Sequence, residues 1–234
     1  MNVVICEDDL HFSNLLRDRL AAMLSAKELP CDIMQFSTGE ACLGHLLSSP
    51  RTDLLFMDIQ LGTEDGVDLV KTIRASLPKL PVIFLTSMED RIGEGYDVSA
   101  FYFLLKKDFE SRLETVFNRF IKEVFMSKSL VLRNGNDLTI LDYDDIYYVE
   151  ADKRNSLIHC ANAMYSENSS IQNFAPHLPA DLFLEVYHAL YVNADHVRRV
   201  DADSLELDND QSLPVSRRKR KELLSAIMRR IQNR

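Results

Sequence analysis

Short apolar runs and amphipathic helical patterns alternate five times along the first half of the chain. The apolar runs lie at residues 3–6, 33–36, 54–57, 82–85 and 101–105, and the helical patterns at 10–24, 40–47, 67–77, around Asp90 and at 109–125. Continuous apolar strands are typical of a parallel sheet that is buried on both faces. The alternation therefore predicts an α/β fold, a (βα)5 doubly wound parallel sheet with helices on both faces.

The pattern changes near Ser127, where short strand-like runs begin to follow one another closely. These runs lie at residues 130–133, 146–149, 157–160, 187–192, 205–207 and 213–215, with turn signals at 134–136 and 208–210. A helical pattern at 217–231 follows them. We therefore expect two domains, an α/β domain over residues 1–126 and a mostly-β domain with a C-terminal helix over residues 127–234.

Charge is spread unevenly over the 234 residues. The net charge of −9 argues weakly against nucleic-acid binding, yet residues 217–234 carry eight basic residues and one acidic residue. The four cysteines lack CxxC spacing, and the apolar runs are too short to span a bilayer. The N-terminus lacks the basic region and cleavage site of a secretory signal. These features predict a cytoplasmic protein with no membrane segment and no zinc site.

Acidic, hydroxyl and basic residues stand at the carboxyl ends of the predicted parallel strands. The acidic run 7–9 follows the first strand, Asp58 the third, Thr86 the fourth and Lys106 the fifth. Because these ends meet at one edge of the sheet, the side chains are expected to converge. Carboxylates this close resist joint ionisation unless a cation is present, and Mg²⁺ accepts such oxygen ligands.

This combination suits phosphoryl transfer to a carboxylate. Asp58 would be the nucleophile, Lys106 would counter the phosphoryl charge, and Thr86 would hydrogen-bond one of its oxygens. Each residue also has a simpler interpretation: an aspartate of the 7–9 run can cap the next helix, and Lys106 can be a solvated strand-end lysine. The coincidence of all of them at the right strand ends favours the phosphoryl site.

Other phosphate-handling sites are disfavoured. Residues 7–10 contain no glycine, whereas a dinucleotide-binding fold or a P-loop requires several after its first strand. A phosphatase with an aspartyl nucleophile often carries a second aspartate two residues later, and Gln60 stands at that position. We therefore do not expect an enzyme that turns over phosphate esters.

Segments 4–9, 55–61, 85–87 and 100–106 resemble the receiver domain of two-component response regulators. The resemblance covers residues 1 to about 122. It implies that a sensor histidine kinase phosphorylates Asp58, and that Thr86 and Phe103 are the switch residues. It also implies Mg²⁺ as the cofactor, at a site formed by the acidic pair Glu7 and Asp8 together with Asp58 and the carbonyl of Gln60.

One residue departs from the receiver pattern. Lys107 stands where receivers usually have proline after the lysine, often in a cis bond. A non-proline cis bond costs about 3 kcal/mol, so a trans link or a changed loop is expected. Either Lys106 or Lys107 could reach the phosphoryl group, and the strand register favours Lys106.

The second half offers basic and amide residues in turns between strands. It lacks the paired helices of a helix-turn-helix and the spacing of a zinc finger. Loops from a rigid sheet can enter a groove and read base edges while neighbouring Lys and Arg neutralise phosphates. The basic run 217–221 can equally be a solvated helix face, and composition alone does not decide between the two.

Segments 144–150, 191–193 and 213–217, with Phe183, resemble the LytTR DNA-binding domain. The resemblance covers about residues 128–232 and implies loops that enter successive major grooves of double-stranded promoter DNA. The positions it implies for DNA binding are Lys153, Arg154, Asn155, His188, Arg217 and Arg218. The segment 185–190 departs from the family pattern, and Glu185 would weaken phosphate contact there.

Together these observations predict a phosphorylation-dependent transcriptional response regulator that forms a homodimer when phosphorylated. An alternative is a response regulator whose output domain acts by protein contact, with weak or no DNA binding. Glu185 and the acidic total favour that alternative, and the basic run at 217–221 disfavours it. A Mg²⁺-dependent phosphatase is a further alternative.

Overall fold

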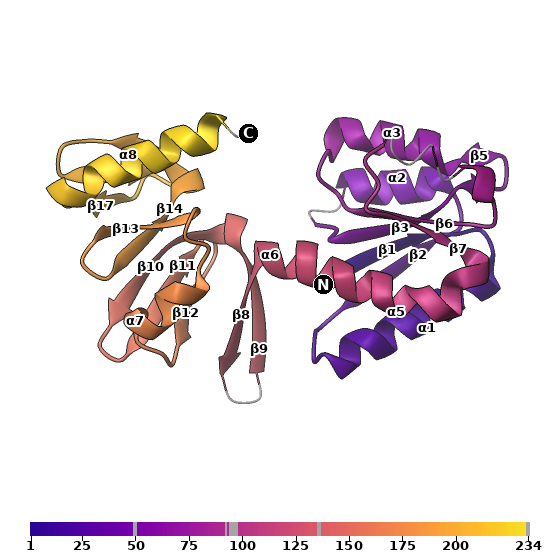
Figure 1. Cartoon of the computed structure of the whole chain (residues 1–234), viewed down its shortest axis with the longest axis horizontal. Helices are drawn as coiled ribbons and strands as arrows, with labels where there is room; N and C mark the ends of the chain where they lie inside the picture. Colours follow the sequence, from indigo (N-terminus) through magenta and orange to yellow (C-terminus); the bar gives the residue numbers. More distant parts are fainter. Residues whose placement is uncertain (49–50, 92, 94–97, 135–136, 233–234) are drawn as a thin grey trace. The chain divides into compact units, whose positions relative to one another are not determined.

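The computed structural model describes residues 1–48, 51–91, 93, 98–134 and 137–232. The chain divides into an N-terminal unit, Met1–Ser127, and a C-terminal unit, Lys128–Arg234 (Figure 1). Within the described part of the chain, none of the helices combines the length and the apolar character needed to cross a membrane.

The N-terminal unit is built on a parallel sheet with strand order β2-β1-β3-β6-β7. The strands are β1 (Asn2–Cys6), β2 (Asp32–Phe36), β3 (Leu54–Asp58), β6 (Val82–Thr86) and β7 (Tyr102–Leu105), and a small hairpin pairs β4 (Gln60–Leu61) with β5 (Glu64–Asp65). Every residue of the neighbouring strands β3 and β6 is buried, as expected where helices cover both faces. The predicted doubly wound sheet is confirmed.

Helices cover both faces of this sheet (Figure 1). α1 (Leu10–Ala26) and α5 (Phe109–Phe120) lie on one face, and α2 (Gly39–Ser48) and α3 (Gly66–Ser76) on the other. α5 continues through a π-helical segment, Ile121–Phe125, into α6 (Met126–Lys128), so the long helix predicted at 109–125 is confirmed. Near Asp90 the structure has a single 3₁₀ turn, Glu89–Arg91, and residues 92 and 94–97 lie outside the described residues.

The C-terminal unit is mostly β with a final helix, as predicted. A five-stranded antiparallel sheet has the order β12-β11-β10-β14-β13, a second sheet has the order β15-β16-β17, and β8 pairs with β9. The elements are β8 (Ser129–Asn134), β9 (Asp137–Asp142), β10 (Ile146–Asp152), β11 (Asn155–Cys160), β12 (Met164–Glu167), α7 (Ile171–Phe174), β13 (Phe183–Tyr187), β14 (Leu190–Asn193), β15 (Val197–Val200), β16 (Ser204–Leu207), β17 (Ser212–Pro214) and α8 (Arg217–Gln232).

The five-stranded sheet buries side chains on both of its faces. On β10, Val149 packs in an apolar cluster with residues of β8, β9 and α7. The adjacent Tyr148 packs in a second cluster with residues of β16 and α8. Because neighbouring side chains on a strand point to opposite faces, the sheet stands between two cores.

The strand expected at 187–192 is wrong, because two strands occupy this segment. β13 ends at Tyr187, β14 begins at Leu190, and His188 and Ala189 form the loop of a tight hairpin. Ala189 has a φ of 56°, a left-handed conformation that usually marks Gly or Asn. The segment has neither residue, so no turn was predicted there. The sequence pattern also missed β9, β12, β15 and α7, and Gly135 and Asn136 of the predicted 134–136 turn lie outside the described residues.

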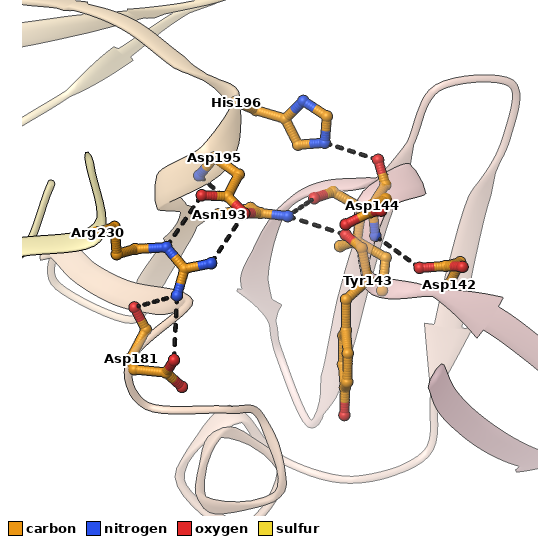
Figure 2. A network of polar contacts seen from close by, with 9 residues as sticks. Asp142, Tyr143, Asp144, Asp181, Asn193, Asp195, His196 and Arg230 are labelled. Atoms are coloured by element: carbon orange, nitrogen blue, oxygen red, sulfur yellow. Dashed lines mark hydrogen bonds and ion pairs between the residues drawn. The ribbon is translucent and has the colours of Figure 1, made fainter. Parts of the chain in front are cut away.

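A buried asparagine ties several loops of the C-terminal unit together (Figure 2). The Asn193 side chain is fully buried and donates hydrogen bonds to the carbonyls of Tyr143 and Ile146, at 2.8 and 2.9 Å. Its Oδ1 accepts a bond from the backbone N–H of Asp195 at 3.0 Å. The Asp195 carboxylate in turn pairs with Arg230 of α8 at 2.8 Å. The network thus links α8 to the loops beside the five-stranded sheet.

Asn193→Ala should destabilise the C-terminal unit strongly. The substitution removes three side-chain hydrogen bonds, two to the buried carbonyls of Tyr143 and Ile146 and one from the N–H of Asp195, so the free energy of unfolding should fall by about 3 kcal/mol. Urea unfolding followed by circular dichroism measures this. The matched control is Asn173→Ala on the exposed surface of α7, which should change stability by less than about 0.5 kcal/mol. Equal effects of the two substitutions would contradict this role of Asn193.

Candidate functional site

The carboxyl edge of the parallel sheet brings together residues from four neighbouring strands. Glu7 follows β1, Asp58 ends β3, Thr86 ends β6 and Lys106 follows β7. Because these strands are hydrogen-bonded neighbours in this order, their ends lie side by side. A pocket of about 260 Å³ opens there, lined by Asp8, Asp58, Gln60, Gly62, Thr86, Ser87, Met88 and Lys106.

Lys106 bridges the two buried carboxylates of the site. Its Nζ lies 2.7 Å from Asp58 Oδ2 and 2.8 Å from Glu7 Oε1, and 4.8 Å from the centre of the Phe12 ring. Burial opposes the charge of Lys106, but the hydrogen bonds to Asp58 and Glu7 outweigh it and raise the Lys106 pKa above its usual value. Lys106 therefore stays charged beside Asp58.

Glu7 is the most deeply buried acid of the site, with 1% of its surface exposed. Burial raises its pKa to about 7, the hydrogen bond from Lys106 opposes this rise, and the charge of Asp58 adds to it. Its Oε2 lies 2.7 Å from Lys106 Nζ but makes no well-aligned hydrogen bond within the described residues. A buried carboxylate oxygen with an unused lone pair is suited to a cation.

Three carboxylates are close enough to share one metal ion. Glu7, Asp8 and Asp58 each offer an oxygen within 4.8 Å of the other two. This donor set is entirely oxygen, as a hard ion such as Mg²⁺ prefers. The residues present therefore fit a divalent cation. Gln60 stands at the same edge, and its backbone N–H donates to Asp58 Oδ1 at 3.2 Å.

Asp9, next to the cluster, has the simpler role that the sequence left open. Its side chain caps α1 by accepting hydrogen bonds from the N–H groups of His11 and Phe12, at 2.9 and 3.2 Å. The Asp8 carboxylate instead accepts a bond from the N–H of Gly62 at 3.0 Å and lines the pocket. Two adjacent aspartates thus have separate functions.

The backbone of Asp58 is fixed by a close approach of Gly66. Gly66 N donates to the carbonyl of Ile59 at 2.7 Å. A Cβ at position 66 would lie 2.0 Å from the Asp58 carbonyl oxygen, well inside van der Waals contact. Only glycine allows the start of α3 to pack this tightly against the end of β3.

Of the two predicted switch residues, Thr86 lines the pocket and Phe103 lies on the neighbouring strand β7. Thr86 is 1% exposed, and its hydroxyl oxygen accepts a bond from the N–H of Met88 at 2.9 Å. The Phe103 ring is partly buried and lies 4.8 Å from that of Phe84. The Lys106–Lys107 peptide is trans, and Lys107 pairs with Glu89, so Lys106 is the lysine that reaches Asp58.

A second group of predicted residues gathers at one end of the C-terminal sheet. The hairpin tips β10–β11 and β13–β14 meet there, where Ala151 N donates to the carbonyl of Ala189 at 3.1 Å. Lys153 has a φ of 56°, a strained conformation for a non-glycine residue. Lys153 and His188 line a common cavity of about 490 Å³ with residues of α7 and β17.

The other predicted DNA-binding residues follow elements that line this cavity: Arg154 and Asn155 come directly after Lys153, and Arg217 and Arg218 come shortly after β17. Arg154 is exposed beside Lys153, and Asn155 is half-buried at the start of β11. Arg217 and Arg218 are exposed at the start of α8, whose preceding residue Ser216 donates from its N–H to the carbonyl of Val186 on β13 at 2.8 Å. The tips of the β10–β11 and β13–β14 hairpins and the start of α8 therefore form one continuous surface, which we call the rim.

Sequence reasoning missed two contributors to this rim. Tyr187 is a large side chain with 47% of its surface exposed, and it lines the cavity beside His188. Gln172, on α7, lines the same cavity. α7 has only four residues, too few to give a helical pattern in the sequence. The exposed tyrosine was hidden because its segment was predicted as one continuous strand.

Comparisons with known proteins match both units. The response regulator receiver domain family matches residues 3–118, and the LytTr DNA-binding domain family matches residues 136–228. The chain belongs to the LytTR-type response regulators. The predicted receiver domain and LytTR domain are thereby confirmed.

Relatives of this response regulator span nearly the whole chain. Sensory transduction protein LytT of Bacillus subtilis is 23% identical, over 95% of this chain and 97% of its own length. Transcriptional regulatory protein YpdB of Escherichia coli K12 is 25% identical, with the same coverage. A solved LytTr DNA-binding domain of a Bacillus cereus response regulator is 20% identical, with a TM-score of 0.38, and covers 43% of this chain and 96% of that domain.

Neutralising Asp8 should weaken divalent-cation binding, and neutralising Asp9 should not. Asp8→Asn removes one charged oxygen ligand from the cluster, so the affinity for Mg²⁺ should fall by about tenfold or more. Asp9→Asn makes the same charge change one residue away, and asparagine still caps α1. Calorimetric titration of each variant with Mg²⁺ measures the difference. Equal losses in both variants would show that the cluster is not the ion site.

Proposed function

We propose that a sensor histidine kinase phosphorylates this response regulator at Asp58 with Mg²⁺, and that the phosphorylated protein regulates transcription by binding promoter DNA. The observation that carries the first step is the bridge that Lys106 forms between Asp58 and Glu7 at the edge of an open pocket. The carboxylate nucleophile and its countercharge already lie together there. Since kinase and promoter act in the cytoplasm, we propose that location for the protein.

Phosphorylation would proceed by direct transfer to a carboxylate oxygen. An Asp58 oxygen attacks the phosphorus of the kinase phosphohistidine, the new P–O bond forms, and the P–N bond breaks. The imidazole leaves as the neutral base once it is protonated. The product is an aspartyl phosphate, with one phosphoryl group per chain.

The surrounding residues supply the charges that this transfer needs. Lys106 can turn its ammonium from Asp58 Oδ2 to a phosphoryl oxygen while it keeps its bond to Glu7. Glu7, Asp8, Asp58 and the Gln60 carbonyl would hold the Mg²⁺ ion. When bound, Mg²⁺ neutralises the carboxylates and the incoming phosphoryl oxygens, which lets these negative groups approach one another.

Thr86 and Phe103 would carry the signal away from Asp58. The Thr86 hydroxyl oxygen accepts from Met88 N–H, and its proton has no acceptor among the described residues. That proton can be donated to a phosphoryl oxygen, which would draw Thr86 and its loop inward. Phe103 then repacks beside it. Such a switch is a shift between two populated states.

The phosphorylated form would act on DNA as a homodimer. Two C-terminal units would then occupy adjacent half-sites, with Lys153, Arg154, Asn155, His188, Arg217 and Arg218 at the DNA. The rim formed by the hairpin tips and the start of α8 supports this proposal, because it groups donors for base edges with cations for phosphates.

Phosphorylation of Asp58 is tested by intact mass after incubation with Mg²⁺ and a small acyl phosphate. The wild-type protein should gain one phosphoryl group, and Asp58→Asn should gain none. Chelation of Mg²⁺ should abolish the gain in the wild type. A gain that survives in Asp58→Asn would place the phosphoryl group elsewhere. Many ester molecules hydrolysed per chain would instead support the phosphatase alternative.

DNA binding is tested by fluorescence anisotropy with a random-sequence duplex at several salt concentrations. Binding should weaken steeply as salt rises, and Arg218→Gln should make the slope of log K against log [salt] shallower by about one. Arg112→Gln, an equal charge change on the exposed surface of α5, should leave the slope unaltered. No binding by the wild type even at low salt would favour an output domain that acts by protein contact.

A further inference from the structure

The basic run at the start of α8 does not present a uniform surface. Arg217, Arg218 and Lys221 are exposed and form no ion pair with another described residue. Lys219 and Arg220 are half-buried and are engaged within the protein. Only part of the run is therefore available to an external anion.

Lys219 is held by two carboxylates of its own unit. Its Nζ lies 2.9 Å from Glu185 Oε2 and 3.6 Å from Glu222 Oε2. The side chains of Lys219 and Glu185 are 29% and 32% exposed, whereas that of Glu222 is 68% exposed. Glu185 is thus the closer and better shielded partner. Its hydrogen bond outweighs the effect of burial and raises the Lys219 pKa, so the ammonium stays charged.

The β13–β14 strand pairing fixes the position of Glu185 at the rim. It lies on β13 directly opposite Tyr191 of β14, two residues before the exposed Tyr187. The N–H of Ser216, just before α8, donates to the carbonyl of the next β13 residue, Val186. The pair with Lys219 therefore spans from the sheet to the helix within the rim.

We propose that Glu185 limits the affinity of this rim for DNA by holding Lys219 away from the phosphates. The inference rests on the proposed DNA binding. Glu185 acts through Lys219, because it occupies an ammonium that would otherwise neutralise a phosphate. Each phosphate that a cation neutralises releases counterions, so one engaged lysine fewer lowers both the affinity and its salt dependence.

The charge on Glu185 can be removed with little change of shape. Glu185→Gln keeps the size of the side chain and an oxygen that accepts a hydrogen bond from Lys219. In full-length protein with a random-sequence duplex, we expect this variant to steepen the slope of log K against log [salt] by about 0.9. Binding at 50 mM salt should tighten by roughly three- to tenfold. Far-ultraviolet circular dichroism and thermal melting verify that the variant is folded.

A double-mutant cycle identifies Lys219 as the residue released. Lys219→Gln alone should leave the salt slope at the wild-type value, because this lysine makes no phosphate contact in the wild type. The Glu185→Gln gain in slope should vanish in the Glu185→Gln/Lys219→Gln protein. Glu114→Gln, an equal change of charge on the exposed surface of α5, should have no effect.

Two results overturn the inference while leaving the proposed function intact. In one, the wild type binds the duplex with a steep salt dependence and Glu185→Gln binds identically. In the other, Glu185→Gln steepens the slope equally with and without Lys219. A wild-type protein that fails to bind any duplex overturns the proposed DNA binding, and this inference with it.

Discussion

The ion pairs of Lys106 with Glu7 and Asp58 are the interaction on which the receiver domain depends. Glu7 directly follows β1 and Asp58 ends the neighbouring parallel strand β3, so the sheet itself forces two buried carboxylates together. Without a cation they could not both ionise. Burial is the main cause of the rise of the Glu7 pKa to about 7, and the charge of Asp58 adds to it. Lys106 offsets part of this cost and leaves room at Asp8 for a metal ion. The same charge balance would let a phosphoryl group enter.

Other residues of the receiver domain hold the groups at the carboxyl edge of the sheet in position. Gly66 lets α3 start against the Asp58 backbone, and Asp9 caps α1 so that only its neighbour Asp8 faces the pocket. Lys107, in place of the usual proline, pairs with Glu89 and leaves Lys106 to face Asp58. In the C-terminal unit, the start of α8 exposes Arg217 and Arg218 to solvent, whereas Lys219 is paired with Glu185.

The sequence predicted the receiver fold and the placement of its site residues well, because strand ends of a parallel sheet are set by simple periodicity. Asp58, Thr86 and Lys106 each follow an apolar run, so their meeting needs no tertiary information. The LytTR domain was harder. His188 and Ala189 turn without glycine, so one strand was predicted where two exist. The Glu185–Lys219 pair joins residues far apart in the chain, and no local pattern could reveal it.

In the proposed function, phosphorylation of Asp58 changes the affinity of the C-terminal unit for DNA. The most direct test compares the affinity of one preparation for promoter DNA before and after phosphorylation, with Asp58→Asn treated in parallel. Promoter fragments can be selected from genomic DNA by the phosphorylated protein. We expect a gain in affinity of about 5- to 150-fold for the wild type and none for Asp58→Asn. Equal affinity of phosphorylated and unphosphorylated wild type would contradict it.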